Sequence, residues 1–499
     1  MNMPASHPIL SPAEARTLET ELFAGDESAE WSAMTRAGAA VARAILDDYR
    51  EIGGFPTDGR VLVLVGKGHN GGDALLAAAE ILEKFPAARA EVIFVFGIRA
   101  LRPLALQAWR RLSDIARERG ATVPAPSGRY VLSLDGIFGF QFRPPVGQPA
   151  AKIISAANKA AVLMRAAIDL PSGLGEAGAT FQADFTYATG SVKSPLLDKA
   201  CGVFAGRIRY LDLGFFSGKP SHVDVRERVL LTDVLEPLRG WRRPSSDKRD
   251  YGHLFVIGGS RSYPGAVMMS VLAALKAGAG LVTAFVPESL AAAYAAHVPE
   301  AMWVGWPETP EGGLALEGSY LLRERISRAD ALLIGPGLSR EAEVLALAAD
   351  VVKTSTVPLV IDADALRPEI VGGGNAPRIL TPHAGEFARI AGENTLADYT
   401  RKTDAVVVLK GAITRVSAAG DEFLSFFGGP VLARGGSGDL LAGMAGALAA
   451  ADPDHLLNAA ARAVVWHGRA ADLLARERGQ VAVHTTEFLD FLPAVLRET

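Results

Sequence analysis

Short apolar runs alternate with segments of helical length along most of the chain, and this pattern strongly limits the folds that the chain can adopt. An apolar run bounded by glycine or charged residues is typical of a buried parallel strand. Parallel strands need long crossover connections, which are usually helices that cover both faces of the sheet. The sequence therefore predicts an α/β protein with parallel sheets between layers of helices.

The predicted elements form two successive series, and each series begins with a strand. In the first, the strands are residues 61–65, 91–96, 130–134, 163–169, 185–189 and 208–213, and the helices are residues 74–84, 104–119 and 149–161. In the second, the strands are residues 254–257, 281–286, 331–334, 359–361, 378–380 and 406–409, and the helices are residues 266–277, 438–451 and 455–476. Because 499 residues exceed what one core normally holds, we predict two domains, residues 1–225 and 226–499.

Composition excludes several classes of protein. Cys201 is the only cysteine, so neither an intramolecular disulfide nor a thiolate-rich metal site can form. The formal net charge of −4 does not suggest a protein that binds nucleic acid. The N-terminal segment lacks the basic start and apolar core of a secretory signal, so we expect a cytoplasmic protein. The most apolar stretch, residues 266–286, is interrupted by Gly278 and Gly280, which favours a helix and a strand of the core over a membrane span.

The first predicted strand runs directly into the glycine-rich string GKGHNGGD, residues 66–73, which precedes a helix. Glycines at such a turn let backbone N–H groups approach an anion, and the helix N-terminus adds positive partial charge. Gly66, Gly68 and Gly71 also match the dinucleotide fingerprint GxGxxG. The next strand ends near Gly97 without the acid that binds a ribose, which argues against an ordinary NAD-dependent dehydrogenase. A tight turn without a ligand is the alternative interpretation.

Two acidic residues follow other predicted strands of the first half. Asp135 opens the string DGIFGFQFRPP, and Asp169 opens the string DLPSG. An acid after a strand is often only a helix cap or a turn former. In an open α/β sheet, however, ligands bind beyond the carboxyl ends of the strands. We therefore expect both acids and the glycine-rich string to meet at one site.

These three strings, in this order, resemble the N-terminal YjeF-type domain of NAD(P)H-hydrate epimerases over about residues 9–216. The resemblance implies that Asp169 is the catalytic acid and base. This role suits the chemistry, because inversion of a carbinolamine carbon needs a proton donor and a proton acceptor. The resemblance also implies a potassium ion held by Asn70, Asp135 and Ser172. The residues implied to bind the hydrated nucleotide are His69, Asn70, Gly71, Gly72, Asp73, Gly139, Phe140, Gln141, Phe142, Arg143, Pro144, Pro145 and Asp169.

The second half carries its most informative motif in the string ARGGSGDLLAG, residues 433–443. Its glycines precede a helix, so the backbone there could surround a phosphate. Asp439 falls in the first turn of that helix and could accept a proton from an attacking hydroxyl. A capped helix start, with Asp439 favoured by the helix dipole, is the alternative interpretation. The sequence contains no GxxxxGK[ST] motif, which excludes a P-loop phosphotransferase.

The string TPHAGEF, residues 381–387, supplies His383 and Glu386 after a predicted strand. Carboxylates, phosphates and water are the usual ligands of Mg²⁺, so Glu386 could act through magnesium. His383 could contact a ligand, or it could equally be a histidine that only stabilises the turn. Neither HExxH nor paired cysteines occur in the sequence, so a zinc site is not supported.

Together with GGSRSYPGA, GPGLS and DADAL, these strings resemble the ribokinase-like superfamily over about residues 228–497. Within it they are most similar to the ADP/ATP-dependent NAD(P)H-hydrate dehydratase branch. The resemblance implies that Asp439 is the catalytic base. The residues implied to bind ADP are Lys410, Gly411, Ala412, Ile413, Thr414 and Gly438, and those implied to bind the hydrated nicotinamide nucleotide are Ala266, Gly337, His383 and Asp439.

The two resemblances predict an N-terminal Rossmann-like three-layer α/β/α domain and a C-terminal ribokinase-like α/β/α domain. The expected function is repair of NADH and NADPH hydrates (NADHX and NADPHX). The first domain interconverts their R and S epimers, and the second dehydrates the S epimer at the expense of ADP, giving AMP and phosphate. We expect K⁺, Mg²⁺ and ADP to take part, no nucleic-acid or membrane partner, and a homo-oligomer. The alternative is a vitamin-precursor or sugar kinase fused to a non-catalytic nucleotide-binding module, since His69 and Ala74 depart from the epimerase pattern.

Overall fold

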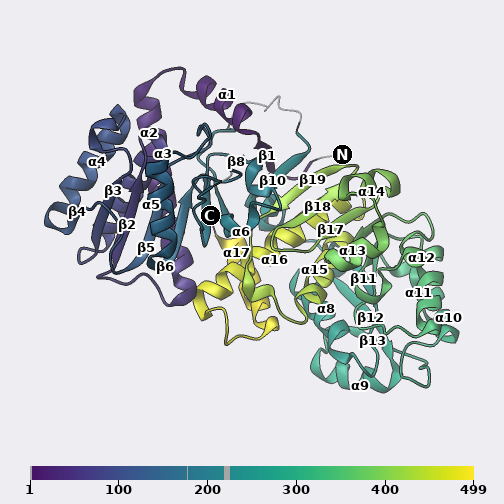
Figure 1. The fold of residues 1–499 in the computed structure, drawn as a ribbon. Coiled ribbons are helices and arrows are strands. Elements are labelled where there is room, and N and C mark those ends of the chain that lie inside the picture. Colours follow the sequence, from purple (N-terminus) through teal and green to yellow (C-terminus); the bar gives the residue numbers. More distant parts are fainter. Residues whose placement is uncertain (1–2, 177, 218–224, 499) are drawn as a thin grey trace. The chain divides into compact units, whose positions relative to one another are not determined.

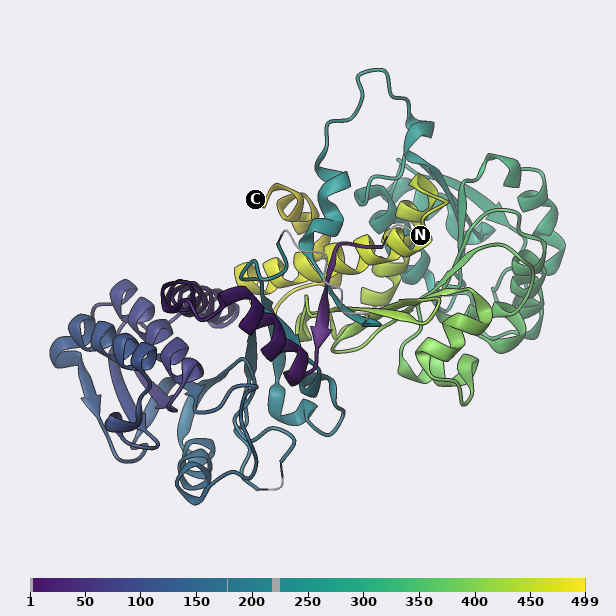
Figure 2. The same ribbon diagram turned by 90° about the horizontal axis from the view of Figure 1, so that it is seen from above.

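The computed structural model describes residues 3–176, 178–217 and 225–498, and it contains two compact units (Figure 1 and Figure 2). The first unit is His7–Val225, and the second unit combines Met1–Ser6 with Arg226–Thr499. Residues 218–224, which directly precede the predicted division between residues 225 and 226, lie outside the described residues.

The first unit is built on a parallel sheet with the strand order β4-β3-β2-β5-β6-β7-β9. Every strand predicted for this half is present, and the short strands β1, β4 and β8 are additional. The strands are β1 (Ser6–Leu10), β2 (Arg60–Val65), β3 (Arg89–Phe94), β4 (Gly120–Thr122), β5 (Arg129–Gly136), β6 (Ala161–Ile168), β7 (Phe185–Thr189), β8 (Val192–Lys193) and β9 (Arg207–Leu211).

Helices cover both faces of this sheet, as the sequence predicts. Successive residues of β2 point to opposite faces, so Val61 and Val63 pack in the core with α2, α3 and α4, whereas Leu62 and Leu64 pack with α5. The result is a three-layer α/β/α unit. Its helices are α1 (Pro12–Phe23), α2 (Glu27–Tyr49), α3 (His69–Lys84), α4 (Pro103–Ala116), α5 (Gln148–Lys159) and α6 (Gly202–Ala205).

Helix α3 begins at His69, earlier than the predicted start at residue 74. Gly71 and Gly72 therefore lie inside the helix and not in a loop. Both are buried, and a Cβ on Gly72 would come within 2.1 Å of Met34 Cε, while one on Gly71 would come within 2.7 Å of the Gly66 carbonyl oxygen. These glycines permit close packing of the helix, a role that the sequence pattern alone does not separate from loop flexibility.

Gly66, at the end of β2, is expected to be intolerant of any side chain. A Cβ there would lie 1.9 Å from the Ile137 carbonyl oxygen, which belongs to rigid backbone. We expect Gly66→Ala to lower the free energy of unfolding by about 2–3 kcal/mol, because the neighbouring strand end must shift. Urea denaturation followed by circular dichroism measures this. Gly68→Ala is the matched control, since its nearest atom would be Arg102 Nη1 at 3.9 Å; equal effects of the two changes would contradict the steric explanation.

The second unit contains a parallel run of strands, β13-β12-β11-β14-β15-β16-β17, followed by β18, β19 and β10. The pairs β17·β18 and β18·β19 are antiparallel. Every strand predicted for this half is present. The strands are β10 (Glu227–Leu230), β11 (His253–Ile257), β12 (Leu281–Pro287), β13 (Met302–Trp306), β14 (Ala331–Ile334), β15 (Leu359–Ile361), β16 (Arg378–Leu380), β17 (Val406–Leu409), β18 (Thr414–Ala418) and β19 (Asp421–Ser425).

Helices again lie on both sides of the strands, and Figure 1 shows α8 and α15 on one side and α11 and α12 on the other. Leu254 and Val256 of β11 pack with α8, α15 and α16, whereas Phe255 and Ile257 pack with α11. The helices are α7 (Glu236–Arg239), α8 (Pro264–Lys276), α9 (Glu288–His297), α10 (Ser319–Arg323), α11 (Ala342–Thr354), α12 (Pro368–Val371), α13 (Ala384–Ala391), α14 (Leu396–Thr403), α15 (Ser437–Ala451), α16 (Leu456–Arg478) and α17 (Leu492–Arg497).

The apolar stretch 266–286 divides into α8 and β12, as the sequence predicts. Both elements contribute to the core of the second unit. Across the described residues, no helix combines the length and the apolar character that crossing a membrane requires.

Candidate active sites

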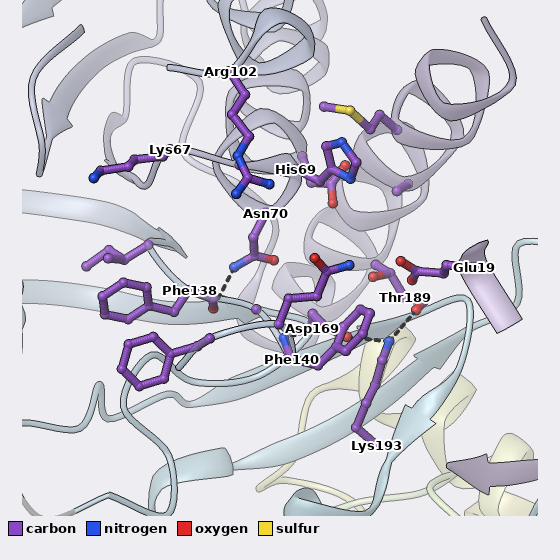
Figure 3. Close-up of a pocket in the computed structure, with 18 of the residues that line it drawn as sticks. Glu19, Lys67, His69, Asn70, Arg102, Phe138, Phe140, Asp169, Thr189 and Lys193 are labelled. Carbon is purple, nitrogen blue, oxygen red and sulfur yellow. Dashed lines mark hydrogen bonds and ion pairs between the residues drawn. The ribbon is translucent and has the colours of Figure 1, made fainter. Parts of the chain in front are cut away.

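The first unit holds a cavity of about 450 Å³ at the carboxyl ends of its central strands (Figure 3). Its lining includes residues that follow β2, β5 and β6, among them Asn70, Phe138 and Asp169. These neighbouring parallel strands end at the same edge of the sheet. The glycine-rich string and Asp169 therefore meet at this cavity, as expected, whereas Asp135 is fully buried outside the lining and bonds to Ser172.

Asp169 forms a buried ion pair with Lys193 at this cavity. Its Oδ1 lies 2.5 Å from Lys193 Nζ, and its Oδ2 accepts a hydrogen bond of 3.0 Å from the Phe140 backbone N–H. Lys193 also donates to the Thr189 carbonyl oxygen at 2.9 Å. Asp169 has a φ of 67°, a left-handed conformation that is costly for a residue with a side chain. The surrounding fold maintains this strained backbone conformation, and the Asp169 carboxylate faces the cavity.

Lys193 is a site residue that no sequence motif identified as functional. It forms the short strand β8 with Val192, and β8 pairs with β1 in the register Leu10↔Lys193. Its side chain is only 1% exposed, yet it carries the charge that pairs with Asp169. A lysine after a strand gives no local signal of burial, because lysine is usually exposed.

The residues implied to bind potassium are linked by a chain of hydrogen bonds. Ser172 Oγ donates to Asp135 Oδ1 and Ser172 N donates to Asp135 Oδ2, both at 2.7 Å. Asn70 Nδ2 donates to the Phe138 carbonyl oxygen at 2.8 Å, and Phe138 N donates to Ser172 Oγ at 2.9 Å. Burial raises the pKa of Asp135 to about 6, against the lowering effect of hydrogen bonds from Ser172 and Ile137. This set of hard oxygen donors fits a monovalent cation, which would favour the ionised carboxylate.

Most of the residues implied to bind the hydrated nucleotide line the cavity, and three do not appear in its lining. The lining residues are His69, Asn70, Asp73, Gly139, Phe140, Gln141, Phe142, Arg143, Pro145 and Asp169, whereas Gly71, Gly72 and Pro144 are absent from it. Lys67 and Arg102 also line the cavity, although neither is among the residues predicted from the sequence. The Arg102 guanidinium lies close to Gly68, at the N-terminus of α3, which adds cationic character where a helix favours anions.

In the second unit, Asp439 occupies the first turn of α15 beside a lysine and a second carboxylate. Lys410 Nζ donates to Asp362 Oδ1 at 2.9 Å, and a Cβ on Gly438 would lie 3.2 Å from Lys410 Nζ. Burial raises the pKa of Asp439 to about 6, and the Asp362 carboxylate adds to this shift while Lys410 opposes it. The structure thus brings together the implied base and two residues implied to bind ADP.

Asp362 is a further site residue, which was not predicted as such although it belongs to the string DADAL. It follows β15 directly and is buried, and Thr381 Oγ1 donates to its Oδ1 at 2.7 Å. The signal that selected Asp135 and Asp169, an acid at a strand end, would also have found it.

His383 and Glu386 form a capping box at the start of α13. His383 Nδ1 accepts a hydrogen bond from Gly385 N at 3.0 Å, and Glu386 Oε2 accepts one from His383 N at 2.8 Å. The turn-stabilising interpretation of His383 therefore describes its present contacts. Glu386 still contributes to the electrostatic environment of Lys410 and Asp439. Among the described residues no cluster of three or more His, Cys, Asp or Glu side chains is arranged to hold a metal ion.

The remaining implied residues of the second unit lie in two places. Gly337, whose φ is 66°, lies close to Ala266. A Cβ on Gly337 would be 3.2 Å from the Ala266 Cβ. These two residues therefore lie together near the start of α8. Gly411, Ala412 and Ile413 connect β17 to β18, and Thr414 is the first residue of β18.

Comparison with known proteins gives matches for both halves. Residues 254–494 match the family described as NAD(P)H-hydrate dehydratase, and residues 32–194 match the family described as YjeF-related protein N-terminus. The chain is 35% identical to the bifunctional NAD(P)H-hydrate repair enzyme Nnr of Moorella thermoacetica, over 93% of this chain and 92% of that protein. It is 36% identical to the enzyme of the same name from Gloeobacter violaceus, over 97% of each chain. A solved ADP/ATP-dependent NAD(P)H-hydrate dehydratase from Bacillus subtilis, co-crystallised with ATP/Mg²⁺, is 30% identical over 52% of this chain and 96% of that chain, with a TM-score of 0.44.

Proposed function

Because this chain belongs to the family of bifunctional NAD(P)H-hydrate repair enzymes, we propose that Asp169 and Asp439 are the catalytic residues of its two activities. The chain is an NAD(P)H-hydrate epimerase and an NAD(P)H-hydrate dehydratase. We assign the epimerase to residues 1–225 and the dehydratase to residues 226–499. The alternative of a kinase fused to a non-catalytic module is not favoured, because relatives of the same bifunctional name match nearly the whole chain.

The buried Asp169–Lys193 pair at the edge of the cavity is the observation that carries the epimerase assignment. The carboxylate is fixed by Lys193 and by the Phe140 N–H, so it is already oriented before a substrate binds. A carboxylate in that position can exchange a proton with the hydroxyl group on the hydrated ring carbon. Asp135, Ser172 and Asn70 would hold a potassium ion, which would neutralise charge near the bound nucleotide.

The dehydratase assignment rests on Asp439 with Lys410 at the N-terminus of α15. The helix terminus and the Lys410 ammonium would bind the phosphates of ADP. Asp439 would take the proton of the substrate hydroxyl as its oxygen attacks the terminal phosphorus and AMP leaves. Loss of phosphate and of a proton from the neighbouring ring carbon then restores the double bond of the nicotinamide ring. Glu386, together with the ADP phosphates, would hold a magnesium ion that offsets phosphate charge.

One assay tests the whole proposal. Purified protein is supplied with mixed NADHX epimers and ADP, and the recovery of reduced-nicotinamide absorbance is followed. We expect complete recovery; recovery of only the S fraction would show that the first site is inactive, and no recovery with either ADP or ATP would overturn the assignment. Replacing potassium by sodium in the same assay tests the cation. The buried Cys201 suits a reducing compartment such as the cytoplasm, and the homo-oligomer stays a prediction that light scattering in solution tests.

A further inference from the structure

A carboxyl group from the N-terminal helix also reaches the epimerase cavity. Strand β1 pairs with β8 in the register Leu10↔Lys193, and α1 starts directly after it with a capping box between Ser11 and Glu14. This arrangement places the next turns of α1 beside Lys193, and Glu19 of α1 lines the cavity. Figure 3 shows Glu19 next to Thr189 and Lys193, with Lys67 and Arg102 on the opposite side of the view.

Glu19 is surrounded by charged groups of this site. The groups that act on it are the Lys193 ammonium and the carboxylates of Asp169, Glu30 and Asp73. Burial, which is the main cause, raises the pKa of Glu19 to about 7; Asp169 and Glu30 add to the shift, and Lys193 opposes it. Glu19 therefore changes its protonation state near neutral pH, which suits an acid or base that must exchange protons in both directions.

The other acidic side chains of the cavity have different contacts from those of Glu19. Asp169 is paired with Lys193, and Glu30 Oε2 lies 3.5 Å from His69 Nε2. Asp73 is buried, its pKa lies well above the ordinary value because of burial, and its Oδ1 has no hydrogen-bond partner among the described residues. The Glu19 carboxylate likewise accepts no hydrogen bond from the described residues and borders the cavity, but Glu19 is only half-buried whereas Asp73 is buried. It is the acid of this group best placed to meet a ligand proton.

We propose that Glu19 is a further catalytic residue of the epimerase, and that it works with Asp169 as the second member of an acid–base pair. The inference rests on the proposed epimerase function of the first unit. It adds a residue that lies in the N-terminal helix, far in sequence from the strings that resemble the epimerase family.

The pair accounts for inversion in both directions. The Glu19 carboxylic acid gives its proton to the hydroxyl on the hydrated carbon, the C–O bond breaks, and its electron pair leaves with water. The lone pair of the adjacent ring nitrogen forms a C=N⁺ bond. Water then adds to the other face of the carbon, and one of its protons passes to the Asp169 carboxylate as the new C–O bond forms. In the reverse direction Asp169 gives the proton and Glu19 takes it.

The experiment measures the pH dependence of R-epimer consumption in the full-length protein. In the wild type, kcat/KM should fall above pH about 7, because the pair must carry one proton and Glu19 loses it there. Glu19→Gln should lower kcat by about 10²-fold, leave KM within about threefold, and remove this alkaline limb. Glu19→Asp retains a carboxyl group. This variant should therefore show a measurable fall of kcat/KM at alkaline pH and keep part of the wild-type rate.

The matched control is Glu21→Gln, which removes an exposed carboxylate from the same helix and should leave rate and pH profile unchanged. A Glu19→Gln protein that keeps both the wild-type kcat and the alkaline limb would overturn the inference. Loss of rate in Glu19→Gln without recovery of the limb in Glu19→Asp would also overturn it, because it would indicate a packing role. If the wild type itself exchanges no epimers, the proposed epimerase function fails and not merely the role of Glu19.

Discussion

Replacing Asp169 by Asn is expected to lower the rate of epimer exchange by about 10³-fold while dehydration of the S epimer continues at the wild-type rate. Asn keeps the shape of the side chain but is a far weaker proton acceptor than a carboxylate. The separate location of Asp439 in the second unit explains why dehydration should be spared. The two rates are read in one assay: fast recovery of the S fraction, followed by slow recovery of the R fraction.

The Asp169→Asn protein needs controls for folding, because the change leaves the buried Lys193 ammonium without its carboxylate. Breaking one side of a buried pair typically costs about 3–5 kcal/mol, so the thermal midpoint of the first unit is expected to fall. Asp169→Glu restores the charge and should recover part of both stability and rate. Asp198→Asn, which changes an exposed carboxylate of the same unit, should leave both unchanged. Unaltered epimer exchange in Asp169→Asn would show that the catalytic assignment is wrong.

The second large effect is expected from Asp439→Asn, which should lower dehydration of the S epimer by about 10³-fold and leave epimer exchange intact. In the wild type, the pKa of Asp439 is raised to about 6 by burial and by Asp362. A base acts only when ionised, so kcat/KM for dehydration should fall as the pH is lowered through about 6. The measurement is a pH profile of dehydration with saturating ADP.

Two comparisons separate the role of Asp439 from a loss of structure. Asp454→Asn changes an exposed carboxylate of the same unit and should preserve both the rate and the acid limb. Binding of ADP, measured by calorimetry, should persist in Asp439→Asn, since Lys410 and the N-terminus of α15 remain. A wild-type rate in Asp439→Asn, or an acid limb that survives the substitution, would exclude Asp439 as the base.

The sequence predicted the sheets and their central strands because a buried parallel strand has a local signal in the sequence. That signal is a short apolar run, such as residues 61–65 or 254–257. It did not predict β18 and β19, whose runs TRVSA and DEFLS mix polar and apolar residues at one side of the sheet. It also placed the start of α3 too late. Glycines within GKGHNGGD indicate a loop by composition, whereas Gly71 and Gly72 lie inside the helix, where Gly72 packs against Met34 and Gly71 against the Gly66 carbonyl group.

The sequence by itself determined that acids follow parallel strands, and hence that Asp135 and Asp169 lie at one edge of a sheet. The tertiary structure alone brought Lys193 and Glu19 to Asp169, through the pairing of β1 with β8, two strands that are far apart in the chain. It also raised the pKa of Glu19, chiefly through burial. A pKa depends on burial and on neighbouring charges, and neither is encoded at the position of the residue that titrates.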